Sequence, residues 1–244
     1  DVGYGKTEVA MRAAARTVFS GKQVAILVPT TVLAFQHFES FKKRFSGTPI
    51  RVESVSRLRS SKENKEALLA LAEGRVDIII GTHRLLSSDV RFKDLGLVVI
   101  DEEHRFGVSH KEKLKRMSES VHLLTMTATP IPRTLNLAMT GVKDISIITT
   151  PPPDRLSVRT FVCRRSEEVI GEAISNEVLR EGQVFFLHNR VETIEKVANE
   201  IKRILPKVTL QVVHGQMEGD ELEKKMLGFY EGKFQILLTT AIIE

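Results

Sequence analysis

Short apolar segments alternate with longer amphipathic segments along most of this 244-residue chain. In the first part of the chain, the short segments predict strands at 23–28, 50–56, 76–80, 95–100 and 121–126. Between them, apolar residues recur at helical spacing and predict helices at 32–45 and 62–73, after a first helix that begins near Glu8 and ends at Gly21. Several strands are apolar throughout, which is typical of a parallel sheet covered by helices on both faces.

A second α/β series follows Pro151–Pro153, which predicts a stiff linker because proline restricts its own backbone and that of the preceding residue. We therefore expect two domains, at 1–150 and 151–244, both truncated at the ends of this sequence, and a first sheet of six or seven strands. The two series share no sequence identity that would establish a duplication. The second series predicts strands at 157–163, 183–187, 209–213 and 234–239, and helices at 166–180, 191–205 and 218–230.

The composition is that of a soluble globular protein, with 42% hydrophobic and 27% charged residues. No apolar run approaches the ~20 residues that span a bilayer. The single cysteine, Cys163, excludes a disulfide framework and a multi-cysteine zinc site, and favours a cytoplasmic setting. We expect Cys163 to be a buried apolar residue of its strand. A net charge of +5 permits a nucleic-acid partner without requiring one.

The first residues end in Gly5-Lys6-Thr7, directly before a predicted helix. This matches the end of the phosphate-loop pattern G-x-x-x-x-G-K-[ST], whose opening glycine would precede residue 1. In such a loop, backbone N–H groups that include those of Gly3 and Gly5 surround a polyphosphate, Lys6 reaches its outer phosphates and Thr7 binds Mg²⁺. The alternative is an ordinary glycine turn at the start of a helix.

Asp101 and Glu102 directly follow the apolar strand at 95–100. In a nucleotide site, Asp101 can hold Mg²⁺ and Glu102 can orient and deprotonate the attacking water. Alternatively, these carboxylates only cap the next helix, a reading that the phosphate-loop pattern upstream disfavours.

Other polar clusters follow predicted strands and would lie at the same edge of the sheet, where parallel sheets bind ligands. Hydroxyls of Thr127 and Thr129 can bond the acidic cluster, and His104 fits a polar relay there better than a metal site. Thr30, Gly81, Thr82 and Asn189 suit contacts to a nucleic-acid backbone, although each alone is more typical of a cap or turn. The basic run 111–116 is a solvated helix face or, less favoured, a DNA-binding face.

Taken together, the motifs resemble those of superfamily 2 helicases over essentially the whole chain. They are G-K-T at 5–7, P-T-T-V-L-A at 29–34, G-T-H at 81–83, D-E-E-H-R-F-G-V at 101–108, T-A-T-P-I-P-R-T at 127–134, H-N-R-V-E at 188–192, H-G-Q-M at 214–217 and T-T-A-I-I-E at 239–244. Within that superfamily, D-E-E-H-R-F-G-V and H-G-Q-M are most similar to the bacterial transcription-repair coupling factors. The RecG helicases come next, and usually carry glutamine at position 103 and H-G-R-M at 214–217.

The resemblance implies two tandem RecA-like domains that bind ATP and Mg²⁺ and move along double-stranded DNA. It implies Gly3, Gly5, Lys6 and Thr7 in the nucleotide loop and Asp101 and Glu102 as the hydrolytic pair. Coupling of hydrolysis to DNA falls to His104, Thr127 and Thr129. The motifs that line the DNA path or the interdomain cleft contain Thr30, Gly81, Thr82, Arg133, Asn189, His214, Gly215 and Gln216.

Three classes of function remain open. The first is a transcription-coupled repair motor that displaces stalled RNA polymerase and recruits excision-repair proteins, and the second is a RecG-like helicase that remodels replication forks. The third is a nucleotide-binding module without catalysis, which the intact Lys6, Asp101 and Glu102 disfavour. RNA helicases commonly carry S-A-T in place of the T-A-T at 127–129, so the sequence points away from them.

The resemblance also places the arginine finger, the adenine-binding glutamine motif and the translocation motif outside these 244 residues. Because an arginine finger contributes roughly 10³-fold or more to the rate, we predict that the isolated segment hydrolyses ATP weakly or not at all. The check is ATP turnover by the segment with and without duplex DNA. A clear DNA-stimulated rate that a Glu102→Gln control abolishes would contradict the prediction.

Overall fold

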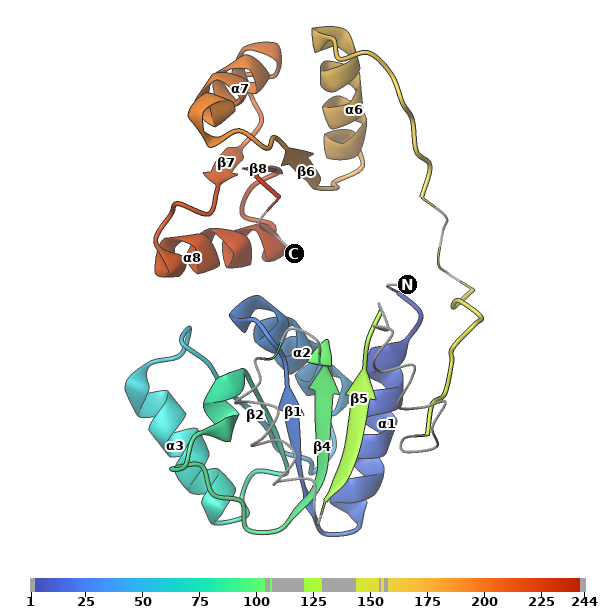
Figure 1. Cartoon of the computed structure of the whole chain (residues 1–244), viewed down its shortest axis with the longest axis vertical. Coiled ribbons are helices and arrows are strands. Elements are labelled where there is room, and N and C mark those ends of the chain that lie inside the picture. The colour runs from blue at the N-terminus through green and yellow to red at the C-terminus, as the bar shows by residue number, and fades with distance from the viewer. Residues whose placement is uncertain are drawn as a thin grey trace. The chain divides into compact units, whose positions relative to one another are not determined.

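The computed structural model describes residues 3–103, 106, 121–128, 144–153, 155 and 158–241, which form two compact units, 1–157 and 158–244 (Figure 1). Each unit is a parallel sheet with helices on both faces, so the α/β fold class predicted from the sequence is confirmed. The first unit contains α1 (Lys6–Phe19), β1 (Gln23–Leu27), α2 (Thr31–Arg44), β2 (Val52–Val55), α3 (Ser61–Ala72), β3 (Ile78–Gly81), the short 3-10 helix η1 (His83–Leu86), β4 (Leu95–Asp101) and β5 (His122–Met126).

The first sheet has the strand order β2-β3-β1-β4-β5, and every neighbouring pair is parallel. The central strands are the most apolar ones, and all five residues of β1 are buried. The expected sheet of six or seven strands is wrong for the described residues, which form five. Each of the five strands predicted within residues 1–150 corresponds to one strand of this sheet.

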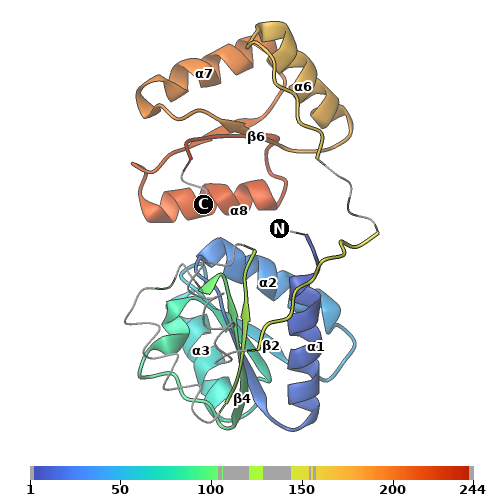
Figure 2. The same ribbon diagram turned by 45° about the vertical axis from the view of Figure 1, so that its right-hand side comes forward.

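Alternate residues of each strand face two separate cores on the two sides of the first sheet. On one side, Val24, Ile26 and Val99 pack with α1 and α2, and on the other, Ala25 and Ile100 pack with α3. Figure 2 shows this sheet nearly edge-on, with α1 on one side and α3 on the other. Because successive side chains of a strand point to opposite faces, the position of each residue in β4 determines which helices its side chain faces. The same rule applies to Asp101, the last residue of β4.

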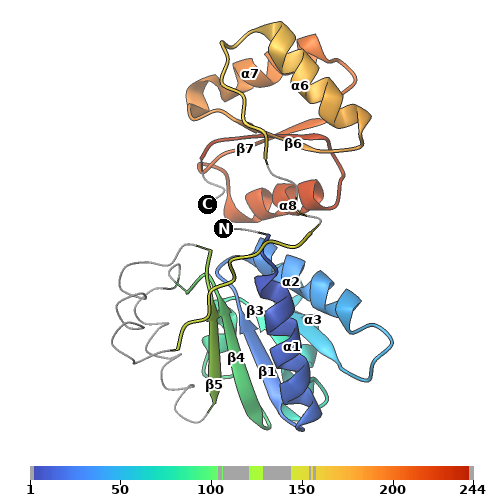
Figure 3. The ribbon, with the colours of Figure 1, turned by 90° about the vertical axis from the view of Figure 1, so that its right-hand side faces the viewer.

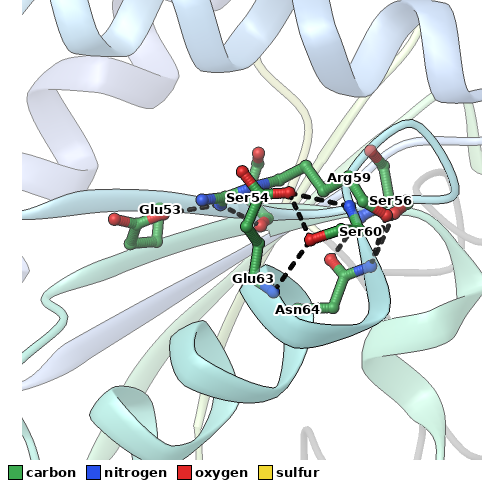
Figure 4. A network of polar contacts seen from close by, with 7 residues as sticks. All are labelled: Glu53, Ser54, Ser56, Arg59, Ser60, Glu63 and Asn64. Atoms are coloured by element: carbon green, nitrogen blue, oxygen red, sulfur yellow. Dashed lines mark hydrogen bonds and ion pairs between the residues drawn. The ribbon is translucent and has the colours of Figure 1, made fainter.

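The segment between β2 and α3 is fixed by a network of polar contacts (Figure 4). The Arg59 guanidinium donates to Glu53 Oε2 at 2.6 Å and to the Ser54 carbonyl at 2.7 Å, while the Asn64 amide bonds both backbone groups of Ser56. Ser60 and Glu63 form a capping box at the start of α3. Hydrogen bonds from the Ser60 hydroxyl and backbone N–H hold the pKa of the Glu63 carboxyl below its usual value. The network therefore holds the backbone in place where the chain leaves the carboxyl end of β2.

The second unit contains α6 (Glu167–Leu179), β6 (Val184–Leu187), α7 (Val191–Ile204), β7 (Leu210–Val213), α8 (Gly219–Tyr230) and β8 (Ile236–Thr239). Its strands are parallel in the order β6-β8-β7. Figure 3 shows the sheet edge-on, with α6 and α7 covering one face and α8 the other.

The strand predicted at 157–163 is wrong over residues 158–163, which have no regular secondary structure. Val158, Phe161 and Val162 are 82–98% exposed, and Cys163 is exposed rather than buried. A β-rich sequence forms a strand only where a neighbouring strand takes up its backbone hydrogen bonds, and the described part of the second sheet offers this segment none.

Both units use a glutamine to hold a helix-to-strand turn; Gln23 is the first residue of β1 and Gln183 directly precedes β6. Gln23 Nε2 donates to the carbonyls of Leu71 and Val76 at 2.8 and 2.7 Å, across the turn between α3 and β3. In the second unit, Gln183 Nε2 donates to the carbonyls of Phe229 and Phe234, across the turn between α8 and β8. The turns share the sequence pattern Glu-Gly-[Arg/Lys], at 73–75 and 231–233, and their glycines have φ of 78° and 73°. The two units thus repeat one local structure although their sequences show no overall similarity.

We predict that Gln23→Leu loosens the first sheet where β1 begins. Gln23 is 5% exposed, and its Oε1 also accepts from the backbone N–H groups of Lys93 and Asp94. The leucine therefore leaves the carbonyls of two buried residues, Leu71 and Val76, and two partly buried N–H groups without this partner. Each buried unpaired group costs about 1–3 kcal/mol, so a loss of about 3 kcal/mol in local stability is a cautious expectation.

Hydrogen–deuterium exchange of the full-length protein measures this loss. The amides of residues 74–78 and 93–95 should exchange roughly 100-fold faster, since 1.4 kcal/mol corresponds to a factor of ten. Gln211→Leu, at an exposed position of β7, is the matched control and should leave these amides unchanged. Equal exchange in Gln23→Leu and wild type would show that the glutamine does not hold the turn.

Candidate nucleotide site

The start of α1 is built to receive an anion. Gly3 and Gly5 have φ of 78° and 84°, a left-handed conformation that glycine adopts without strain. Gly5 is the N-cap of α1 and provides no side-chain cap, so the first N–H groups of the helix have no capping side chain. Lys6 and Thr7 form the first helical positions. Together with the positive end of the helix dipole, these features give the geometry of a phosphate-binding turn.

A second observation concerns Arg155, which the sequence reasoning missed. Its guanidinium carbon lies 4.5 Å from the centre of the Tyr4 ring, and a Cβ added at Gly3 would lie 3.4 Å from its Nε. An arginine over an aromatic ring contributes about 0.5–1 kcal/mol at an exposed site. The segment after Pro151–Pro153 therefore contacts the candidate phosphate loop directly. Composition and spacing gave no signal for this contact, because Arg155 and Tyr4 are 151 positions apart.

Asp101 is the last residue of β4 and lies at the carboxyl edge of the sheet. It has the same strand parity as Leu97 and Val99, which face α1 and α2. Its Oδ2 accepts a hydrogen bond of 2.9 Å from Nε2 of His37, a residue on the buried face of α2. The side chain of Asp101 is 14% exposed and that of His37 is 6% exposed. Sequence reasoning missed His37, whose only signal is its position between Ala34 and Phe41 in the apolar stripe of α2.

Glu102 follows with φ of 53°, a left-handed conformation that costs a non-glycine residue roughly 1–2 kcal/mol. Its carboxylate is held from the end of the neighbouring strand β5. The Thr127 hydroxyl donates to Oε2 at 3.1 Å and the Ala128 N–H to Oε1 at 3.2 Å, while Glu102 N–H donates to the Met126 carbonyl at 2.9 Å. Strained residues that the surrounding structure holds in place cluster at functional sites. The turn after β5 thus orients the second carboxylate.

The topology brings the two halves of the candidate site to one edge. Because α1 leads into β1 and runs opposite to it, the helix begins at the edge where β1, β3 and β4 end (Figure 1). Lys6 and Thr7 at the start of α1 therefore lie at the same edge as Asp101 and Glu102 at the end of β4. Parallel sheets bind nucleotides at this edge.

The oxygen donors at this edge fit a magnesium ion better than a transition metal. The described residues contain no group of three or more His, Cys, Asp or Glu arranged to hold a metal on their own. Mg²⁺ commonly takes one or two protein oxygens and completes its shell with water and phosphate. The Thr7 hydroxyl and the Asp101 carboxylate supply oxygens of that kind.

The candidate nucleic-acid residues of the first unit differ in exposure. Thr30 is exposed, and its side chain caps α2 by accepting from the Leu33 N–H at 3.3 Å. Gly81 is buried, and a Cβ there would lie 2.7 Å from the Val55 carbonyl, so its glycine allows β2 and β3 to approach. Thr82 is 9% exposed. Of these three residues, Thr30 has the side chain on the surface.

In the second unit, Asn189, Gly215 and Gln216 are exposed after β6 and β7, whereas His214 is partly buried. Asn189 lies two residues after the end of β6, and the other three follow β7, so all four lie at the carboxyl edge of the second sheet. His104, Thr129 and Arg133, and the basic run 111–116, lie outside the described residues.

Comparison with known proteins decides the family. Residues 1–138 match the family model "DEAD/DEAH box helicase", and residues 166–244 match "Helicase conserved C-terminal domain". The chain belongs to the DEAD/DEAH box helicases. The predicted superfamily 2 helicase motor is thereby confirmed, with both of its helicase domains represented.

The relatives include transcription-repair-coupling factors. The chain is 55% identical to that of Escherichia coli K12 and 56% identical to that of Myxococcus xanthus, in each case over all 244 residues. These matches cover the whole of this chain but only 21% and 20% of those proteins. Among solved structures, RecG bound to a three-way DNA junction is 35% identical with a TM-score of 0.78, covering 100% of this chain and 33% of that one.

Within the described part of the chain, none of the helices combines the length and apolar character that crossing a membrane requires.

Proposed function

We propose that this chain is the ATP-binding and ATP-hydrolysing core of a motor that moves along double-stranded DNA. The observation that carries the proposal is the meeting, at one edge of the first sheet, of the Lys6–Thr7 helix start with the Asp101–Glu102 pair. A glycine turn at the start of a helix, taken alone, is explained by its structural role there and requires no ligand. A glycine turn that shares its edge with two held carboxylates has the parts of a nucleotide-hydrolysing site.

The roles follow from the chemistry of each group. The N–H groups of the Gly3–Gly5 turn and the Lys6 ammonium bind the phosphates, and the Thr7 hydroxyl and Asp101 carboxylate hold Mg²⁺. When bound, Mg²⁺ neutralises charge on the phosphate oxygens. Glu102, held by Thr127 and Ala128, orients the attacking water and accepts its proton.

The turn after β5 suits a coupling role. Movement of residues 127–128 changes the hydrogen bonds on Glu102, so a signal from bound DNA that reaches this turn alters the position of the general base. We assign coupling to Thr127 on this contact, and to Thr129 and His104 on their place in the same motifs.

Contacts to DNA are assigned to polar groups at the carboxyl edges of both sheets. In the first unit these are Thr30, Gly81 and Thr82, and in the second Asn189, His214, Gly215 and Gln216. Arg133 lies outside the described residues and is assigned on its motif alone. The buried Gly81 and Thr82 would act by shaping the backbone of that edge, and the exposed Thr30 by direct contact. Hydroxyls, amides and helix N-termini of this kind bind phosphate without reading bases.

For the full-length protein we propose a role in transcription-coupled repair, in which the motor displaces stalled RNA polymerase and brings in excision-repair proteins. The support is 50–56% identity to transcription-repair-coupling factors over this entire chain. Glu103 and Gln216 also follow the pattern expected of that group. A second candidate, a RecG-like motor on branched DNA, is supported by the 35% identity to RecG on a three-way junction.

We predict that Glu102→Gln in the full-length protein lowers DNA-stimulated ATP hydrolysis by at least about 100-fold, because glutamine cannot accept the proton of the attacking water. Affinity for ATP should stay within about threefold of wild type, since the phosphate-binding groups are unchanged. Lys6→Ala should instead weaken nucleotide binding. The measurements are steady-state turnover and binding of a fluorescent ATP analogue.

Glu103→Gln is the matched control, because it makes the same chemical change one residue away and should retain most of the activity. If Glu102→Gln keeps wild-type turnover, Glu102 is not the general base and the proposed site is wrong. Stimulation by duplex DNA, by a branched junction and by RNA separates the leading proposal from the RecG-like and RNA-helicase alternatives.

A further inference from the structure

His37 is a polar residue in an apolar surrounding. It lies on the face of α2 that also carries Ala34 and Phe41, and this face packs against β2 and β3 in the core on that side of the sheet. Its ring centre is 6.3 Å from that of Phe41. A leucine or phenylalanine would satisfy the apolar stripe of the helix without burying polar atoms, so packing alone does not explain a histidine here.

The two ring nitrogens of His37 have different surroundings. Nε2 lies 2.9 Å from Asp101 Oδ2 and donates to it, because a carboxylate only accepts. Nδ1 is buried and has no hydrogen-bond partner among the described residues. A buried polar atom without a partner opposes folding. Burying the histidine therefore lowers stability through Nδ1, and the hydrogen bond that it forms in exchange is the one to Asp101.

That hydrogen bond limits the motion of the Asp101 carboxylate. Rotation about the terminal bond of an aspartate is soft, so an unheld carboxylate samples a wide range of orientations. Because the carboxylate is a rigid planar group, fixing Oδ2 also fixes the direction of Oδ1. The described residues provide no hydrogen-bond partner for Oδ1, which leaves it available to a ligand at the carboxyl edge of β4.

We propose that His37 is a positioning residue for the Mg²⁺ ligand Asp101. The imidazole binds one carboxylate oxygen from α2 and holds the other toward the magnesium of the nucleotide complex. This inference rests on the proposed function, because it requires that Asp101 hold Mg²⁺. Partners that hydrogen-bond a ligating carboxylate from behind typically contribute 10–100-fold to metal affinity or activity.

Three substitutions in the full-length protein test the proposal. His37→Gln keeps a donor, because glutamine Nε2 is the same number of bonds from Cβ as histidine Nε2. His37→Asn is the matched control, because its amide nitrogen corresponds to Nδ1 and is one bond too short to reach Asp101. His37→Leu removes the donor and keeps an apolar volume that suits the stripe of α2.

The main readout is the Mg²⁺ concentration that half-saturates binding of N-methylanthraniloyl-ADP, a measurement without turnover. We expect this concentration to rise by about tenfold or more in His37→Leu and His37→Asn, and to stay within about threefold of wild type in His37→Gln. The second readout is kcat for ATP at saturating Mg²⁺, which should recover most of its wild-type value in all three variants. A thermal unfolding scan of each variant shows whether it is folded.

Each result either supports or overturns the proposal. Rescue by glutamine together with loss in asparagine supports a positioning role, even if the leucine variant fails to fold. Wild-type Mg²⁺ dependence in both His37→Asn and His37→Leu overturns the inference alone, as does an equal change in the asparagine and glutamine variants. A wild-type protein that binds the nucleotide without any Mg²⁺ dependence overturns this inference together with the metal site of the proposed function.

Discussion

The parallel direction of all five strands in the first sheet is the constraint on which the candidate site depends. Strands that run the same way end at the same edge, so the polar residues that follow them in sequence gather there although they are far apart along the chain. The helix before β1 must then begin at that edge, which brings the start of α1, where no side chain caps the helix, to the residues that follow β4. A phosphate at this position would accept hydrogen bonds from the first turn of α1, and in the proposed site the acidic pair completes a hydrolytic centre.

The two neighbouring carboxylates are held from different parts of the first unit. Asp101 is bonded from α2, through His37, whereas Glu102 is bonded from the turn after β5, through Thr127 and Ala128. In the proposed site, Asp101 would therefore keep its orientation toward Mg²⁺ while the position of Glu102 depends on the turn. The left-handed backbone of Glu102 adds a strained element that these contacts hold in place.

Sequence patterns predicted the elements whose formation depends on their own local sequence. They failed for elements and contacts that depend on residues far away along the chain. The strands near 23–28, 76–80 and 95–100 were predictable because buried parallel strands are apolar throughout, and the start of α1 because Gly5-Lys6-Thr7 carries its own chemistry. The segment 158–163 has an equally β-rich sequence, yet it has no partner strand in the described sheet and Cys163 is exposed. The contacts of His37 with Asp101 and of Arg155 with Tyr4 join residues 64 and 151 positions apart, and no spacing rule predicts them. Gln23 and Gln183 were likewise not predictable as a pair, because only the structure shows that each side chain bridges a helix-to-strand turn.

The central claim is that one nucleotide lies between the start of α1 and the end of β4. A crystal structure of the full-length protein with Mg²⁺ and a non-hydrolysable ATP analogue tests it most directly. The account predicts the outer phosphates against Lys6, the metal bonded to Asp101 directly or through one water, and a water within hydrogen-bonding distance of Glu102. A nucleotide bound elsewhere, or bound at α1 with its metal away from both carboxylates, would contradict the account.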